Sequence, residues 1–211
     1  MEVSTFQQIV SLIEKSENIL LVTHRKPDGD AVGSTMAMYK ALTLLGKKVT
    51  AASTDKLPES FDFLPEIENL SQGLNAGQDF VVTLDCDQTE VDRLKYHLED
   101  NKIHIIITPK QGRFFKENVS CQEGHEEFDL IISLDVADIP QLGKLYEENK
   151  KLFSSVPIVN IDHHVSNTQF GRINYVDPGA SSTAEILHGL LRHMETHFGK
   201  TFMIPEIATF L

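Results

Sequence analysis

Short apolar segments rich in Val, Ile and Leu recur along the chain, and they restrict its fold more than any other feature. Most of them are separated by stretches in which apolar residues follow helical spacing. Continuous apolar segments of this length are typical of strands buried on both faces, as in parallel sheets covered by helices. We therefore predict an α/β fold, a largely parallel sheet with helices on both faces. The segments are Ile19 to Thr23, Phe80 to Leu84, Ile103 to Ile107, Leu130 to Leu134 and Ile158 to Ile161.

Composition and charge narrow the class of protein. The chain has 211 residues, of which 41% are hydrophobic, enough for an ordinary globular core. Its formal net charge of -12 argues against a surface that grips long duplex nucleic acid through its phosphates. No apolar run approaches the roughly 20 residues that cross a bilayer, and the first residues do not resemble a signal peptide. Cys86 and Cys121 lack the spacing of a zinc ribbon or a disulfide framework, so we expect a cytoplasmic protein.

Acidic residues follow three of the predicted strands. Asp85 with Asp87, Asp135 with Asp138, and Asp162 each stand at or just after the end of an apolar segment. Ligands of open α/β sheets bind beyond the carboxyl ends of the strands, so distant residues can converge there. Asp135 suits a carboxylate that bridges two cations, and Asp138 suits a helix N-cap. Asp85 and Asp87 match the same local pattern as Asp135, and spacing alone does not choose between them.

The turn THRKPDGDAVGS carries the first cluster of candidate ligands. His24, Asp28 and Asp30 lie between a predicted strand and the helix from Ala31 to Leu45. One imidazole and two carboxylates can point at a common cation, and mixed nitrogen and oxygen ligation suits Mn²⁺ better than Mg²⁺. The alternative is an ordinary polar turn in which an Asp caps the helix.

The segment VNIDHHVSN carries the second cluster, directly after a predicted strand. Because adjacent side chains point in different directions, one of His163 and His164 can ligate a metal while the other meets the substrate. Asp162 suits a supporting role in which it accepts a ring proton from a histidine and fixes its tautomer. The alternative is a pair of surface histidines in a loop.

A possible phosphate contact lies in NYVDPGASSTAEIL. Backbone N-H groups and the hydroxyls of Ser181 and Ser182 stand at the start of a predicted helix, where anions bind. A helix cap completed by Glu185 explains the same residues without a ligand. The remaining histidines lack a carboxylate at ligand spacing or are isolated, and we interpret them as surface or packing residues. They are His97, His104, His125, His188, His193 and His197.

Four motifs, taken in order, resemble those of the DHH phosphoesterases, closest to the branch of nanoRNases and 3'-phosphoadenosine 5'-phosphate phosphatases. They are THRKPDGDAVGS, SLDVADIPQLG, NIDHHVSN and VDPGASSTAEIL. The resemblance implies two Mn²⁺ ions, with Mg²⁺ as an alternative, and selects Asp135 over Asp85. It implies that His164 faces the substrate and, with Asp135, is catalytic. The implied metal ligands are His24, Asp28, Asp30, Asp135 and His163.

The same resemblance implies a function. It predicts a manganese-dependent phosphoesterase that acts as an exonuclease on short oligoribonucleotides, or on small nucleotides such as 3'-phosphoadenosine 5'-phosphate, through a water activated by two metals. The expected partners are short RNA or a nucleotide, with no long duplex and no membrane, and a homodimer is compatible with the sequence. The alternatives are a pyrophosphatase or polyphosphatase of the same superfamily and a non-catalytic nucleotide-binding or interaction domain.

The resemblance also predicts a domain organisation. Residues 1–198 would form the catalytic domain, with an inserted or extra unit at about 85–128, and residues 199–211 would begin a further helix. In the family, another metal-binding Asp and a C-terminal substrate domain of the DHHA1 type follow. We expect both to be missing from this chain, which would make it a truncated form. Asp177, placed before Pro and Gly, suits a turn rather than a substitute ligand.

Overall fold

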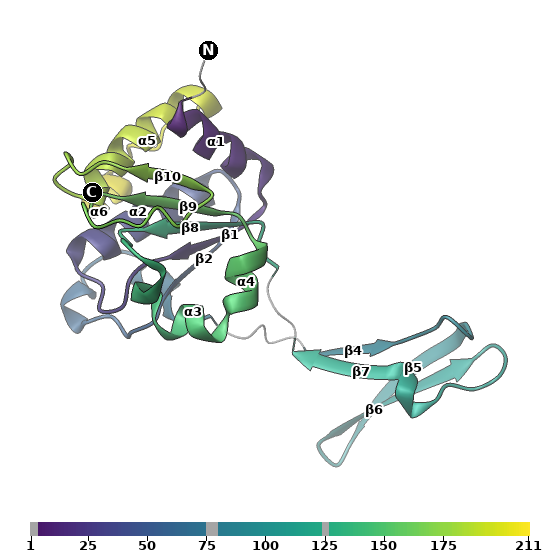
Figure 1. Ribbon diagram of the computed structural model, residues 1–211. Coiled ribbons are helices and arrows are strands. Elements are labelled where there is room, and N and C mark those ends of the chain that lie inside the picture. Colours follow the sequence, from purple (N-terminus) through teal and green to yellow (C-terminus); the bar gives the residue numbers. More distant parts are fainter. Residues whose placement is uncertain (1–3, 75–79, 124–126) are drawn as a thin grey trace. The chain divides into compact units, whose positions relative to one another are not determined.

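The computed structural model describes residues 4–74, 80–123 and 127–211. The chain divides into two compact units (Figure 1). The main unit comprises Met1–Leu74 and Glu127–Leu211, and the inserted unit comprises Asn75–Glu126. Each unit has β-sheets of its own.

The main unit is built on a six-stranded sheet with the order β10-β9-β8-β1-β2-β3. All its neighbouring strands pair in parallel. In register, Leu21 of β1 lies between Ala51 of β2 and Ile132 of β8. The strands are β1 (Asn18–Val22), β2 (Lys48–Ser53), β3 (Leu70–Gln72), β8 (Leu130–Leu134), β9 (Ile158–Asp162) and β10 (Ile173–Val176).

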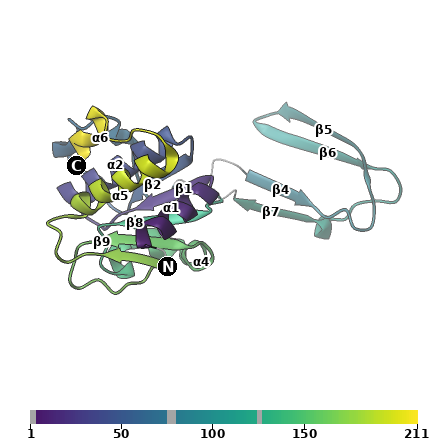
Figure 2. The same ribbon diagram turned by 90° about the horizontal axis from the view of Figure 1, so that it is seen from above.

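Helices cover both faces of this sheet, as predicted (Figure 2). Alternate residues of β1 point to opposite faces: Ile19 and Leu21 join one apolar core, and Leu20 and Val22 join the other. The first core also packs against α1 (Thr5–Lys15), α2 (Gly29–Leu44), α5 (Thr183–Phe198) and α6 (Pro205–Phe210). The second packs against α3 (Lys144–Glu148) and α4 (Lys150–Ser155). Burial on both faces explains why these strands are continuously apolar.

The boundaries of α2 and α5 follow from their capping residues. Asp28 caps α2 by accepting a hydrogen bond from the Ala31 amide, and Ser182 caps α5 by accepting one from the Glu185 amide. Gly199 ends α5 in the left-handed conformation, which a glycine adopts without strain. The main unit also contains the 3-10 helices η1 (Glu59–Phe61), η2 (Ile67–Asn69) and η4 (Ile139–Leu142).

The inserted unit contains two small antiparallel sheets. β4 (Phe80–Leu84) pairs with β7 (Val119–Glu123), and β5 (Val91–Glu99) pairs with β6 (Lys102–Pro109). Asp100 and Asn101 both have positive φ, which is the requirement of the tight type I' turn that joins β5 to β6. The 3-10 helix η3 (Lys116–Asn118) precedes β7.

Two of the apolar segments were therefore wrongly expected in the parallel sheet. Phe80 to Leu84 and Ile103 to Ile107 lie in the antiparallel sheets of the inserted unit. A short apolar run has no periodicity that separates a doubly buried strand from a hairpin strand. The connections carry the missing information, because antiparallel partners need only a short turn whereas parallel partners need a long crossover.

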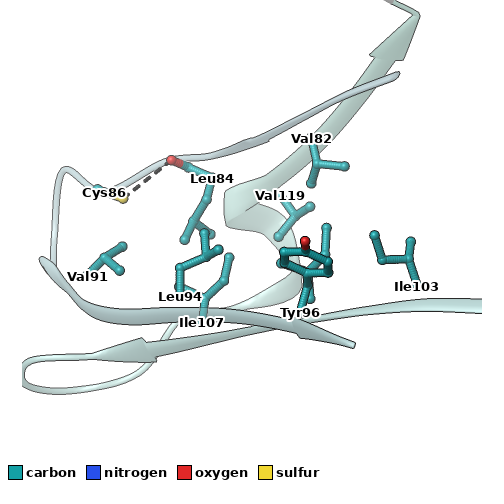
Figure 3. A pocket seen from close by; sticks show the side chains of 10 residues that line it. Val82, Leu84, Cys86, Val91, Leu94, Tyr96, Ile103, Ile107 and Val119 are labelled. Atoms are coloured by element: carbon teal, nitrogen blue, oxygen red, sulfur yellow. Dashed lines mark hydrogen bonds between the residues drawn. The ribbon is translucent and has the colours of Figure 1, made fainter. Parts of the chain in front are cut away.

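Apolar side chains of the inserted unit line an open pocket of about 330 Å³ (Figure 3). Figure 3 shows Leu94, Tyr96 and Ile107 of the hairpin lying toward Leu84 and Val119 of the other sheet. Leu94 and Tyr96 remain 61% and 68% exposed, so this pocket is not a closed core. Among the described residues of the whole chain, no helix is long and apolar enough to cross a membrane.

Candidate metal centre

The candidate ligands of the main unit come from the carboxyl ends of adjacent strands. His24 follows β1, Asp135 follows β8, and His163 and His164 follow β9. The sheet places β9, β8 and β1 side by side, so these ends meet at one edge. Asp28 joins them from the start of α2.

Asp135 lies at the centre of the cluster. Its side chain is only 2% exposed, and its carboxylate oxygens lie 3.5 Å from His24 Nε2, 3.8 Å from His163 Nε2 and 3.6 Å from His164 Nδ1. A buried carboxylate beside three imidazoles is costly unless positive charge or hydrogen bonds compensate it. The surroundings of Asp135 therefore suit a cation.

The donor atoms fall into two groups that share Asp135. One group is His24, Asp28 and Asp135, the other is Asp135, His163 and His164, and within each group the donor atoms lie within 4.8 Å of one another. Imidazole nitrogens together with carboxylate oxygens are a donor set that divalent transition metals accept. A carboxylate common to both groups has the position from which it can bridge two cations.

Asp30 accepts hydrogen bonds from the start of α5, whereas its spacing from His24 and Asp28 suggests that it joins their ligand group. Its Oδ2 accepts a hydrogen bond from the Thr183 amide at 2.7 Å, and its Oδ1 accepts from the Ala184 amide at 2.9 Å and from the Ser34 hydroxyl at 3.1 Å. It belongs to neither ligand group, although its Oδ2 lies 3.7 Å from His163 Nε2. In this arrangement Asp30 ties the first turn of α2 to the first turn of α5.

The backbone and a hydroxyl hold Asp135 in place. Asp135 has a φ of 60°, a left-handed conformation that is uncommon for a residue other than glycine and typical of functional positions. Its amide donates to the Ile161 carbonyl at 3.0 Å, and its Oδ1 accepts a buried hydrogen bond from Thr183 Oγ1 at 2.8 Å. Contacts with β9 and with the start of α5 therefore fix the orientation of the Asp135 carboxylate.

Asp162 and Asn167 orient His164. His164 Nδ1 lies 2.7 Å from Asp162 Oδ1, and Asp162 Oδ2 accepts a hydrogen bond from Asn167 Nδ2 at 2.6 Å. Asn167 Nδ2 also donates to the Val136 carbonyl. A carboxylate at Nδ1 favours the tautomer with the proton on that nitrogen, which leaves Nε2 of the half-exposed ring free to meet another group.

The proton affinities of this cluster depart from their ordinary values. The contact with Asp135 raises the pKa of His24, and the contact with Asp162 raises the pKa of His164. Burial raises the pKa of Asp30. Burial pushes the pKa of Asp135 upward too, but its contacts with His24 and Thr183 outweigh that effect and leave the pKa lowered. Asp135 therefore favours the charged form that a cation requires.

Several other predicted residues lie elsewhere or do something different. Asp85 and Asp87 belong to the inserted unit, where the Asp85 carboxylate accepts from the Asp87 amide. Asp138 is the N-cap residue of η4, as predicted, but its side chain makes no capping bond and instead accepts from the Thr168 hydroxyl. The reason is that its carboxylate turns toward the loop after β9. Asp177 accepts from the Gly179 amide in a turn.

Ser181 and Ser182 form the start of α5 as the capping alternative describes. Ser182 is the N-cap, and both the amide and the hydroxyl of Ser181 donate to Glu185 Oε2. Thr183 and Asn167, which donate hydrogen bonds to Asp135 and Asp162, were not predicted as supporting residues. They lie inside the strings ASST and VSN, and only their position next to the helix start and the histidine pair could have suggested a supporting role.

A family profile and two curated proteins resemble this chain in sequence. Residues 18–110 match the profile of the DHH family, N-terminal domain, and this segment contains His24, Asp28 and Asp30. A Thermus thermophilus protein named bifunctional oligoribonuclease and PAP phosphatase NrnA is 24% identical over 193 residues, which cover 92% of this chain and 42% of that protein. A Streptococcus mutans protein named a probable enzyme of the same kind is 21% identical over 184 residues, or 87% of this chain and 41% of that protein.

A solved structure shares the fold. An exopolyphosphatase-related protein from Bacteroides fragilis matches with a TM-score of 0.65 and 19% identity, over 98% of this chain and 47% of that one. The chain thus spans less than half the length of each of these proteins.

Proposed function

From the premise that this chain belongs to the DHH family, we propose that its main unit is the metal-binding part of a phosphoesterase. The observation that carries the proposal is the position of Asp135, which is 2% exposed and common to two groups of metal-binding donors. A bridging carboxylate between two cations is the arrangement used for hydrolysis of phosphate esters by paired metals.

We assign the ligands as His24, Asp28, Asp30, Asp135 and His163. Mn²⁺ is the proposed cation, with Mg²⁺ as the alternative, because nitrogen and oxygen donors are mixed. When bound, a pair of such ions supplies an activated water and stabilises negative charge on the phosphate. Asp30 Oδ2 lies 3.7 Å from His163 Nε2 while it accepts from the Thr183 amide, so its second lone pair could face the same cation as His163.

His164 is the proposed contact to the scissile phosphate. Its side chain is 46% exposed, whereas that of Asp162 behind it is fully buried, so the ring presents its free edge outward. The contact with Asp162 raises the pKa of His164 and therefore favours a protonated ring that can donate to a phosphate oxygen. Ser181 and Ser182 are secondary candidates, whose hydroxyls would bind phosphate in competition with their bonds at the start of α5.

The proposed substrates are short oligoribonucleotides, degraded exonucleolytically, or small nucleotides such as 3'-phosphoadenosine 5'-phosphate. The names of the Thermus and Streptococcus relatives support this class, and the net charge of -12 favours short substrates over long duplexes. The exposed free thiols of Cys86 and Cys121 suit the reducing cytoplasm in which we place the reaction.

Calorimetric titration with Mn²⁺ tests the metal centre directly. The unmodified chain should bind two ions, and Asp135→Ala should lose at least one of them because the shared donor is gone. Asp85→Ala is the matched control, since it removes an Asp after a similar apolar strand outside the centre, and it should bind like the unmodified chain. Equal binding by Asp135→Ala and the unmodified chain would refute the centre.

Hydrolysis of a substrate panel tests the reaction. With Mn²⁺ present, release of mononucleotides from a dinucleotide, or of phosphate from 3'-phosphoadenosine 5'-phosphate, supports the leading proposal, and Asp135→Ala should abolish it. Polyphosphate or pyrophosphate is the second candidate substrate, because the Bacteroides protein that shares the fold is exopolyphosphatase-related. Nucleotide binding without turnover of any of these substrates would instead identify a non-catalytic binding domain.

A further inference from the structure

A second cluster of metal-binding side chains lies on the hairpin of the inserted unit. His97 of β5 and His104 of β6 are direct cross-strand partners, and Glu99 stands two residues after His97. Residues two apart on a strand share one face, so the three side chains project from the same face of the hairpin. Leu94 and Tyr96 line the apolar pocket, and His97 is on the opposite face from Tyr96.

The geometry of the three side chains suits one cation. The two imidazole rings are stacked, with centroids 4.8 Å apart and an interplanar angle of 10°. His97 Nε2 lies 3.6 Å from Glu99 Oε2, and the donor atoms of all three residues lie within 4.8 Å of one another. Tetrahedral zinc needs its donors about 3.3 to 3.6 Å apart, given bonds of about 2.0 to 2.2 Å. The in-plane lone pairs of two nearly parallel rings do not converge, so both exposed imidazoles would rotate to meet one cation.

We propose that His97, Glu99 and His104 form a surface site for a divalent transition cation of the zinc class. Two imidazoles and one carboxylate are the protein ligands, and water completes the coordination. Two nitrogen donors among three exclude Mg²⁺ and Ca²⁺ as the preferred ions, because those ions select oxygen. This site is separate from the centre around Asp135, which belongs to the main unit.

Basic residues on the same face reduce the affinity without removing the site. Strand alternation and register place Arg93, Lys95 and Lys102 on the face of His97. These side chains are exposed, so solvent and salt screen their repulsion of a cation.

A bound cation would stabilise the hairpin. The site links β5 to β6 close to the turn at Asp100 and Asn101. The His97 and His104 pair is the third cross-strand pair from that turn. An isolated two-stranded hairpin is at best marginally stable in water, so a cross-strand metal clip favours the paired state. Amide hydrogens of β5 and β6 should consequently exchange more slowly when the metal is bound.

Equilibrium dialysis against Zn²⁺, with metal content measured by mass spectrometry, tests this site on the whole chain. His97→Ala and His104→Ala should each bind one equivalent fewer than the unmodified chain. His188→Ala, which removes an exposed histidine of α5, is the control and should bind the same number. Hydrogen exchange of the hairpin should slow with Zn²⁺ in the control and not in the two variants.

Asp135→Ala separates this proposal from the proposed function. It should keep the zinc-dependent slowing of exchange in β5 and β6 even though it loses metal at the main centre. If the zinc stoichiometry and the hairpin exchange of His97→Ala and His104→Ala equal those of the control, the hairpin site does not exist. Loss of the hairpin effect in Asp135→Ala would equally overturn it, because the zinc would then act through the main centre.

Discussion

Two strands of similar composition, one in each unit, differ in how far their apolar residues are buried. Every residue of Leu130–Leu134 in the main unit is buried, whereas Phe80 in the strand Phe80–Leu84 of the inserted unit is 67% exposed. The first strand has neighbours on both edges and helices on both faces, and the second has one paired neighbour. Burial therefore depends on what covers a strand and not on how apolar it is.

The two histidine clusters differ in the same way. In the main centre, Asp135 is held by the Thr183 hydroxyl and by a constrained backbone, and its side chain is 2% exposed. In the hairpin cluster, Glu99 is 67% exposed and His97 is 49% exposed. A buried polar network fixes its donors before a ligand arrives, and an exposed cluster must be ordered by the ligand itself.

The largest expected difference between the units is in core packing. Ile132→Ala in β8 should lower the free energy of unfolding by about 2 to 5 kcal/mol, because its side chain is fully buried and its loss leaves a cavity. Ile106→Ala in β6 is the matched control, and because Ile106 is 50% exposed its effect should stay within about 0.5 kcal/mol. Urea unfolding of both variants measures the difference, and equal losses would show that the inserted unit has a covered core.

Thr183→Val should weaken Mn²⁺ binding about 10- to 100-fold, the usual effect of removing a group that supports a metal ligand. The substitution keeps the shape of the side chain and removes the hydroxyl that donates to Asp135. That bond helps to keep the pKa of Asp135 low, so the variant should also lose metal at a higher pH than the unmodified chain as pH falls. Calorimetry over a pH series is the measurement, and Thr196→Val on the exposed side of α5 is a control.

Asp129 lies near the point where the chain returns to the main unit. Asp129→Asn should lower the free energy of unfolding by a smaller amount than Ile132→Ala. The Asp129 carboxylate accepts from the amides of Asn18 and Glu17, which lowers its pKa. A lowered carboxyl pKa stabilises the fold above the unfolded pKa, and this contribution disappears as pH falls through the folded pKa. We expect a loss of up to about 1 kcal/mol at neutral pH, because the group is exposed.

Unfolding measured at neutral pH and at a pH below the folded pKa of Asp129 tests the sign. The two proteins should differ in the first condition and converge in the second. A difference that persists or grows in acid would show that the charge of Asp129 is not the source of the effect.

Replacing residues 75–126 with a short Gly and Ser linker should change the stability and the Mn²⁺ binding of the main unit least of all. No residue of 80–123 belongs to either buried core cluster, so the melting temperature of the main unit and its Mn²⁺ binding should change little. Differential scanning calorimetry and metal titration are the measurements. A large loss of stability would show that the main unit relies on the inserted one.

Much of the main unit was predictable because its signals are local. Continuous apolar strands and helical spacing predicted the α/β sheet, and Ser182 with Glu185 indicated the start of α5. The inserted unit was less predictable, since Phe80 to Leu84 and Ile103 to Ile107 have the composition of buried strands without the covering helices. The cross-strand pairing of His97 with His104 was not foreseen either, because it depends on hairpin register and not on sequence spacing.

By itself, the sequence determined the α/β class and the residue types available for metal chemistry, since periodicity and side-chain chemistry are local properties. Which groups meet was decided only by the tertiary structure. Sheet order brings Asp135 beside His24 and His163, while Asp85, its equivalent by local pattern, lies in another unit. The physical reason is that strand order and register set distances between residues far apart in the chain, and a metal centre depends on those distances.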